Sequence, residues 1–87
     1  MVVFTPALQR HVAVPDSRVP ASTVREALDR VFSDRPKARG YILDDTGAVR
    51  HHVAIFLDGA AIADRAAQSD PVREDSEIYV MQALSGG

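Results

Sequence analysis

Apolar residues in this chain fall into short runs, and the spacing within the runs changes along the sequence. Over residues 24–32 they recur every three or four positions, as on one face of a helix. Thr23, with Glu26 three positions later, forms a capping-box pattern ahead of this face. The pattern predicts a helix that ends before Pro36, because proline disfavours helix in the preceding residue. The predicted face consists of Val24, Ala27, Leu28, Val31 and Phe32.

The other apolar runs are short and rich in β-formers, and they predict strands. Residues 1–5 and 11–14 are each closed by a proline, which favours an opening hairpin. The longest β-rich run ends in Asp58-Gly59, a strong hairpin-turn signal. Further strands are expected over 40–43, 48–57 and 78–81, with a short strand near 61–62 and a helical turn near Pro71.

This order of elements predicts an α+β protein with the layout of a β-grasp fold. One main helix would cross a mixed sheet of about four or five strands. Residues 1–84 are expected to form a single domain, and residues 85–87 a flexible C-terminal tail ending in Gly-Gly.

Composition and charge narrow the possible functions. The net charge is -2 and the arginines are scattered, so binding driven by nucleic-acid phosphates is not expected. No apolar run reaches the ~20 residues of a membrane span, and no signal-peptide pattern opens the chain, which favours a cytoplasmic location. The chain has no cysteine, so any sulfur that it handles must be carried elsewhere than on a thiol.

The tail suits a carrier of an acyl group. Gly86 and Gly87 have no side chains, so they can enter a narrow channel in many backbone conformations. A carboxylate becomes a good electrophile once ATP and Mg²⁺ convert it to an acyl adenylate. A sulfur nucleophile can then displace AMP and leave a thiocarboxylate on Gly87. The simpler alternative is a frayed polar terminus.

The combined features resemble the MoaD/ThiS family of ubiquitin-like sulfur carriers. They are the order of elements, the Asp58-Gly59 turn, the Glu74-Asp75 turn and the Ser85-Gly86-Gly87 ending. Most members have alanine where this chain has Ser85, which is a mild departure. Residues 49–57 look closer to the longer carriers of cysteine or siderophore pathways than to the short thiamin carrier.

The resemblance implies that a partner enzyme does the chemistry. A ubiquitin-activating-type adenylyltransferase would use ATP and Mg²⁺ to adenylate Gly87, and a sulfur-accepting biosynthetic enzyme would receive the sulfur. The chain would then bind no cofactor and have no catalytic residues of its own. Of the family's functional residues, the resemblance carries only Gly86 and Gly87 over to this sequence.

A partner must dock near the tail. Because side chains alternate along strands, Phe56, Tyr79 and Met81 are expected to point away from the helix. With Leu84 they form the predicted partner-binding surface, since aromatic and Met side chains are common interface anchors. The alternative is that some of them cover the sheet edge or are buried under residues 60–72.

Other candidate chemistry is weaker. His51 and His52 are adjacent in a predicted strand and would face opposite sides, and His11 is distant in sequence, so no metal site is expected. Asp44-Asp45 fits a solvated turn better than an acid–base pair.

Three other functions fit the same features. The chain could be a protein modifier conjugated through Gly87, with Lys37 as its single lysine. It could be the small subunit of a molybdopterin synthase, inserting its tail into a large subunit. It could also be a β-grasp binding module whose two terminal glycines have no role.

Overall fold

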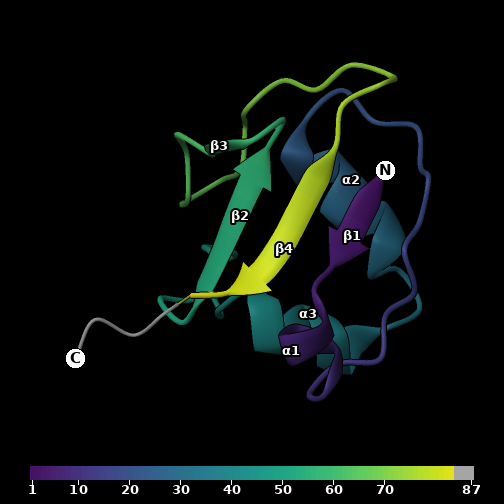
Figure 1. The fold of residues 1–87 in the computed structure, drawn as a ribbon. Coiled ribbons are helices and arrows are strands. Elements are labelled where there is room, and N and C mark those ends of the chain that lie inside the picture. The colour runs from purple at the N-terminus through teal and green to yellow at the C-terminus, as the bar shows by residue number, and fades with distance from the viewer. Residues whose placement is uncertain (84–87) are drawn as a thin grey trace.

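The structure, a computed structural model, describes residues 1–83, which form a mixed sheet with helices packed against one face (Figure 1). Its strands are β1 (Val2–Phe4), β2 (Val53–Leu57), β3 (Ala60–Ala61) and β4 (Ile78–Gln82). Its helices are α1 (Pro6–Gln9), α2 (Val24–Val31) and α3 (Pro36–Ile42).

The last strand lies in the middle of the sheet. The strand order is β1-β4-β2-β3, with β4 parallel to β1 and antiparallel to β2. The register pairs Ile55 of β2 with Val80 of β4, and Val2 of β1 with Ile78 of β4. The first and last strands of the described chain are therefore neighbours, and β4 has partners on both sides.

The core lies between the sheet and the helices, and alternation along the strands decides which side chains enter it. Val53 and Ile55 of β2 and Val80 of β4 are at most 1% exposed. The predicted face of α2 is buried against them, and Phe32 packs on Phe4 with ring centroids 5.9 Å apart. Each such side chain contributes about 1.5–3 kcal/mol on full burial, so the single face of α2 is a major part of the stability.

The predicted start of α2 is confirmed. The Thr23 hydroxyl accepts a hydrogen bond from the Glu26 N–H at 3.1 Å, and a Glu26 carboxylate oxygen accepts one from the Ser22 N–H at 2.8 Å. The Glu26 N–H, which the helix itself cannot satisfy, is thus paired with the cap, and the Glu26 side chain ties the residue before the cap to the helix.

The strand predicted over residues 40–43 is wrong, because these residues belong mainly to α3. Pro36 does follow α2, but it also occupies the first turn of α3, where its fixed φ suits a helix and its missing N–H costs nothing. Only Leu43 shows β-type pairing, in an isolated bridge with Val49.

The opening hairpin is also wrong. Residues 11–14 form no strand, although Val12 and Val14 are buried. The Gln9 side chain supplies hydrogen bonds that a neighbouring strand would otherwise make. Its amide donates to the Val14 carbonyl at 2.7 Å and accepts from the Val14 N–H at 3.1 Å. The antiparallel partner of β1 is the single residue Ser17, which exchanges two hydrogen bonds with Val2.

The hairpin between β2 and β3 is confirmed. Asp58 and Gly59 have φ of 50° and 90°, the left-handed conformations that a two-residue hairpin turn needs. β2 begins at Val53, later than the expected run from residue 48, and β3 covers Ala60–Ala61. No helical turn forms at Pro71, which makes an isolated bridge with Thr23 instead.

Residues 62–72 follow β3, and hydrogen bonds to two carboxylates stabilise this segment. Asp70 accepts from the N–H groups of Ala63 and Asp64 at 2.8 and 3.0 Å. Asp64 in turn accepts from the N–H of Ala67 at 3.0 Å and from Ser69. The Ser69 hydroxyl, followed by these N–H groups, holds the pKa of Asp64 below its usual value.

Candidate functional site

The end of β4 is the part of the structure that leads into the predicted tail. The Ala83 N–H donates to the His52 carbonyl at 2.8 Å, which continues the β2–β4 pairing one step past the strand. The four residues that follow, Leu84, Ser85, Gly86 and Gly87, lie outside the described part of the chain. The structure thus gives the position from which the predicted tail leaves the domain, at the end of the central strand (Figure 1).

The sheet face opposite the helices carries the predicted partner-binding residues. Tyr79 of β4 pairs with Phe56 of β2, and Met81 pairs with Ala54. Tyr79 is 37% exposed, whereas Phe56 and Met81 are half-buried. All three therefore point away from the core, as alternation predicts, and we call Phe56, Tyr79 and Met81 the outer patch.

The outer patch continues across the whole sheet. Val3 of β1 pairs with Tyr79, and Ala61 of β3 pairs with Phe56, so one apolar row crosses all four strands. Val3 is half-buried and Ala61 is exposed. Met81 lies one step nearer to the tail than this row. The row is mainly apolar and crosses the sheet near the start of β4.

Tyr79 supplies the polar group of this face. Its hydroxyl donates to a Glu77 carboxylate oxygen at 3.2 Å. This hydrogen bond, together with the Glu77 charge, raises the pKa of Tyr79 above its usual value. A neutral phenol can contact an apolar partner surface at its ring and still hydrogen-bond at its rim.

An aromatic cluster lies near the end of β4 and was not predicted. The Tyr41 ring stacks on His11 with centroids 5.2 Å apart, and its other neighbour is His52 at 4.8 Å in an edge-to-face arrangement. His52 is the residue whose carbonyl binds Ala83. Sequence reasoning missed the cluster because it assigned Tyr41 to a strand, whereas α3 carries this ring towards His11 and His52.

The two adjacent histidines lie in a turn ahead of β2, not in a strand as expected. Their rings approach edge-to-face with centroids 6.2 Å apart, and His52 Nε2 is buried with no hydrogen-bond partner among the described residues. Within residues 1–83, no three His, Cys, Asp or Glu side chains are grouped so that they could hold a metal ion.

In the acidic pair at 44–45, Asp44 accepts hydrogen bonds from its own turn. One Asp44 carboxylate oxygen accepts from the Thr46 N–H at 2.9 Å, from the Thr46 hydroxyl at 2.7 Å and from the Ala48 N–H at 3.1 Å. The Thr46 hydroxyl is the main cause that holds the pKa of Asp44 below its usual value. Asp45 is exposed in the same turn. These contacts agree with the predicted solvated turn.

No helix in the described part of the chain is long and apolar enough to cross a membrane.

No protein-family profile matches the chain, and no curated protein sequence matches it either.

Solved structures do match. SAMP1 from Haloferax volcanii superposes with a TM-score of 0.75 at 22% identity, covering 99% of this chain and 96% of that one. The small archaeal modifier protein 1 (SAMP1) from Methanosarcina acetivorans gives a TM-score of 0.77 at 16% identity, with 99% and 93% coverage. A chain of the Amycolatopsis orientalis BexX/CysO complex gives 0.73 at 19% identity, with 99% and 97% coverage.

The chain has the ubiquitin-like β-grasp fold. The match extends over nearly the full length of both chains, so the fold class predicted from the order of elements is confirmed. Two of its supporting details were wrong, namely the opening hairpin and the strand over residues 40–43.

Proposed function

We propose that this β-grasp chain is a sulfur carrier that acts as a protein cosubstrate. In this proposal a ubiquitin-activating-type adenylyltransferase activates the carboxylate of Gly87. A sulfur donor then converts it to a thiocarboxylate, and a sulfur-accepting biosynthetic enzyme removes the sulfur.

The observation that carries the proposal is the position of β4. The strand with partners on both sides leads directly into the sequence that ends in Gly86-Gly87. The last described backbone hydrogen bond of this strand is made by Ala83. The four residues after it span at most about 14 Å when fully extended. An enzyme that acts on Gly87 must therefore bring its active site close to the end of the sheet.

That reach defines where the partner would dock. The outer patch lies on β2 and β4, and Met81 is only two positions before Ala83. Burial of exposed aromatic and Met side chains is a common source of affinity at protein interfaces. We propose that the outer patch, together with Leu84, binds the adenylyltransferase and then the sulfur acceptor, so one surface would serve successive partners.

The chemistry needs no catalytic side chain from this protein. A Gly87 carboxylate oxygen would attack the α-phosphorus of ATP, and pyrophosphate would leave with the help of Mg²⁺ in the partner. A sulfide sulfur would then attack the acyl carbon, and AMP would leave, which gives the thiocarboxylate. Because the sequence has no cysteine, the thiocarboxylate would be the only anionic sulfur nucleophile on the chain.

A second function uses the same activated group. Solved neighbours are named small archaeal modifier protein 1, which favours conjugation of Gly87 to an amine on another protein. Lys37, the single lysine, is exposed near the start of α3, so chains of this protein could be linked through one side chain only. A role as the small subunit of a molybdopterin synthase would use the same tail with a different acceptor.

Removal of Gly87 tests the proposal. We expect the truncated chain to lose sulfur transfer completely in a reaction with adenylyltransferase, ATP, Mg²⁺ and sulfide, while its urea unfolding midpoint stays that of the wild type. Lys37→Arg is the control, because it removes the one internal acceptor and should leave sulfur transfer unchanged. Sulfur transfer by the truncated chain would refute the carrier function.

A further inference from the structure

A groove with a volume of about 690 Å³ lies at the end of the sheet where β4 begins. Ile78, the first residue of β4, lines it, whereas the tail follows the last residue of that strand. About 13 Å of strand separates these two ends at 3.3 Å per residue. The volume is within the range of sites that bind small molecules or short peptide segments.

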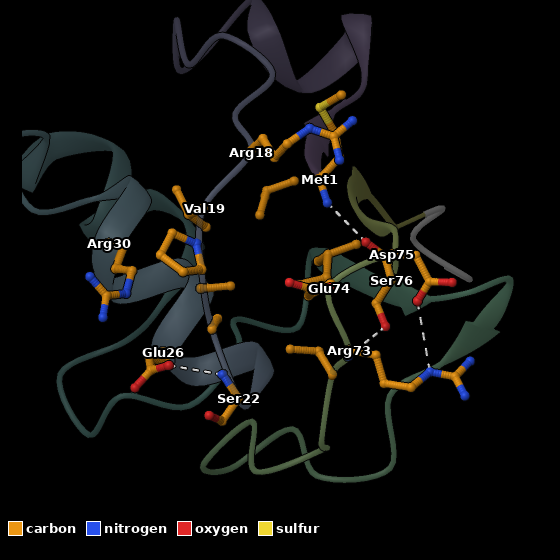
Figure 2. Close-up of a pocket in the computed structure, with 16 residues that line it drawn as sticks. Met1, Arg18, Val19, Ser22, Glu26, Arg30, Arg73, Glu74, Asp75 and Ser76 are labelled. Atoms are coloured by element: carbon orange, nitrogen blue, oxygen red, sulfur yellow. Dashed lines mark hydrogen bonds and ion pairs between the residues drawn. The ribbon is translucent and has the colours of Figure 1, made fainter.

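The groove has an apolar floor and two walls that come from distant parts of the sequence. Figure 2 shows residues 18–22 and α2 on one side and residues 72–76 on the other. Ala27 of α2 and Ile78 are at most 3% exposed, and the half-buried Val19 and Val72 pack against the same core. A bound side chain would therefore contact mainly Val19 and Val72, whose partly exposed side chains pack on the core.

Backbone hydrogen bonds fix both walls. The Val72 N–H donates to the Ser22 carbonyl at 2.9 Å, which joins the two walls at one end of the groove. The Arg73 N–H donates to the Ser76 hydroxyl at 2.8 Å and closes the turn over residues 73–76 (Figure 2). A groove that is already formed does not have to be ordered by its ligand, which reduces the entropic cost of binding.

The rim of the groove carries charged side chains, of which some have a partner and others have none within the described residues. Arg73 pairs with Asp75 at 3.8 Å, and Glu26 accepts from the Ser22 N–H. Arg18 and Arg30 make no side-chain hydrogen bond or ion pair with any described residue. Arginine without a partner beside an apolar floor suits a carboxylate that arrives next to an apolar side chain.

Glu74 limits the charge of the ligand. Its carboxylate also lacks a partner within residues 1–83, and it lies on the wall of residues 72–76, away from Arg30 on α2 (Figure 2). A ligand with several acidic groups would meet repulsion there, whereas one acidic group could lie beside either Arg18 or Arg30, which point in different directions (Figure 2). The rim thus favours a segment with a single acid next to apolar residues.

We propose that this groove binds an extended peptide segment of a partner protein, in which apolar side chains adjoin one acidic residue. The groove is at the start of β4, whereas the chain continues towards Gly87 from the other end of that strand. The chain would then have two binding sites, and this second site does not depend on what Gly87 carries.

Titration of the ¹⁵N-labelled chain with blocked tetrapeptides tests the proposal. The probes are Asp-Val-Val-Ser, Ser-Val-Val-Ser and Lys-Val-Val-Ser, each acetylated and amidated, followed by amide chemical shifts. We expect the acidic peptide to bind at least about threefold more tightly than the neutral one, as ion pairs at a solvent-exposed rim allow. The shifts should be confined to residues such as Val19, Ala27 and Val72.

Charge variants make the result specific. Arg18→Glu/Arg30→Glu should reverse the preference so that the basic peptide binds more tightly, and Glu74→Gln should strengthen binding of the acidic peptide. Arg10→Glu, which changes an exposed arginine outside the groove, should leave the order of the three affinities unchanged. Equal affinities for the three peptides, an unchanged preference in the double variant, or shifts confined to the outer patch would each overturn the proposal.

Discussion

Gln68 holds three parts of the chain together from a fully buried position. Its side chain is 0% exposed and its backbone has a φ of 52°, which is unusual for a residue other than glycine. The amide nitrogen donates to the Gly47 carbonyl at 3.0 Å and to the Arg65 carbonyl at 2.8 Å. Its own backbone carbonyl accepts from the Arg25 N–H at 2.9 Å. We therefore predict that Gln68→Leu is strongly destabilising although leucine is similar in size.

The magnitude follows from the two lost donors. Each hydrogen bond contributes about 0.5–1.5 kcal/mol net, and a carbonyl left buried without a donor costs about 1–3 kcal/mol. The carbonyls of Gly47 and Arg65 keep some access to water, because Gly47 is half-buried and Arg65 is exposed. We therefore expect a total loss of about 2 kcal/mol. For a domain of this size, that loss lowers the melting temperature by roughly 8–16 °C.

Urea unfolding followed by circular dichroism measures this loss. Gln82→Leu is the matched control, because Gln82 is exposed and makes no side-chain hydrogen bond within the described residues. The control should stay within about 0.5 kcal/mol of the wild type. If Gln68→Leu also stayed within that range, the hydrogen bonds of Gln68 would not contribute to stability as argued here.

Further predictions concern the core, a loop carboxylate and the outer patch. Leu28→Ala should cost about 2–5 kcal/mol in urea unfolding, because Leu28 is 0% exposed in the core. Asp64→Asn should flatten the acid limb of the stability curve. The folded state lowers the pKa of Asp64 from 3.8, so its stabilising effect is complete above that pH and is lost as the pH falls below it. Met81→Glu should weaken binding to the adenylyltransferase, measured by titration calorimetry, more than it lowers the unfolding midpoint.

Each of these predictions has a contradicting result. A midpoint for Leu28→Ala equal to that of the exposed-site variant Arg10→Ala would show that the α2 face adds little to the core. Parallel acid limbs for wild type and Asp64→Asn would mean that the Asp64 contacts do not depend on ionisation. A Met81→Glu chain that unfolds easily but binds normally would make Met81 a core residue and remove it from the outer patch.

Features that depend on residues close in sequence, such as helix α2, could be predicted from the sequence. Its apolar spacing, the Thr23–Glu26 cap and the Asp58-Gly59 turn depend on contacts within a few residues, and all three were predicted correctly. The orientation of Tyr79 and Phe56 followed from alternation once β2 and β4 were assigned.

The failures have physical reasons. Pro36 fits after one helix or in the first turn of the next, and sequence alone does not distinguish the two. Residues 11–14 have apolar alternation, but the Gln9 amide replaces a strand partner, a contact that no pattern reveals. The aromatic cluster and the groove are each formed by segments distant in sequence, so they appear only in the folded chain. The proposed carrying residue, Gly87, was found from sequence chemistry alone and lies outside the described residues.

The most direct test of the sulfur-carrier account is peptide mass spectrometry after incubation with an adenylyltransferase, ATP, Mg²⁺ and sulfide, followed by iodoacetamide. Alkylation is needed because exchange of oxygen for sulfur and oxidation of methionine change the mass almost equally. The sequence has no cysteine, so rapid alkylation should mark only a thiocarboxylate. The account predicts one alkyl group on the peptide that ends in Gly87 and none without ATP. An unmodified Gly87 after activation, on a chain found linked to other proteins in cells, would contradict it and favour the modifier function.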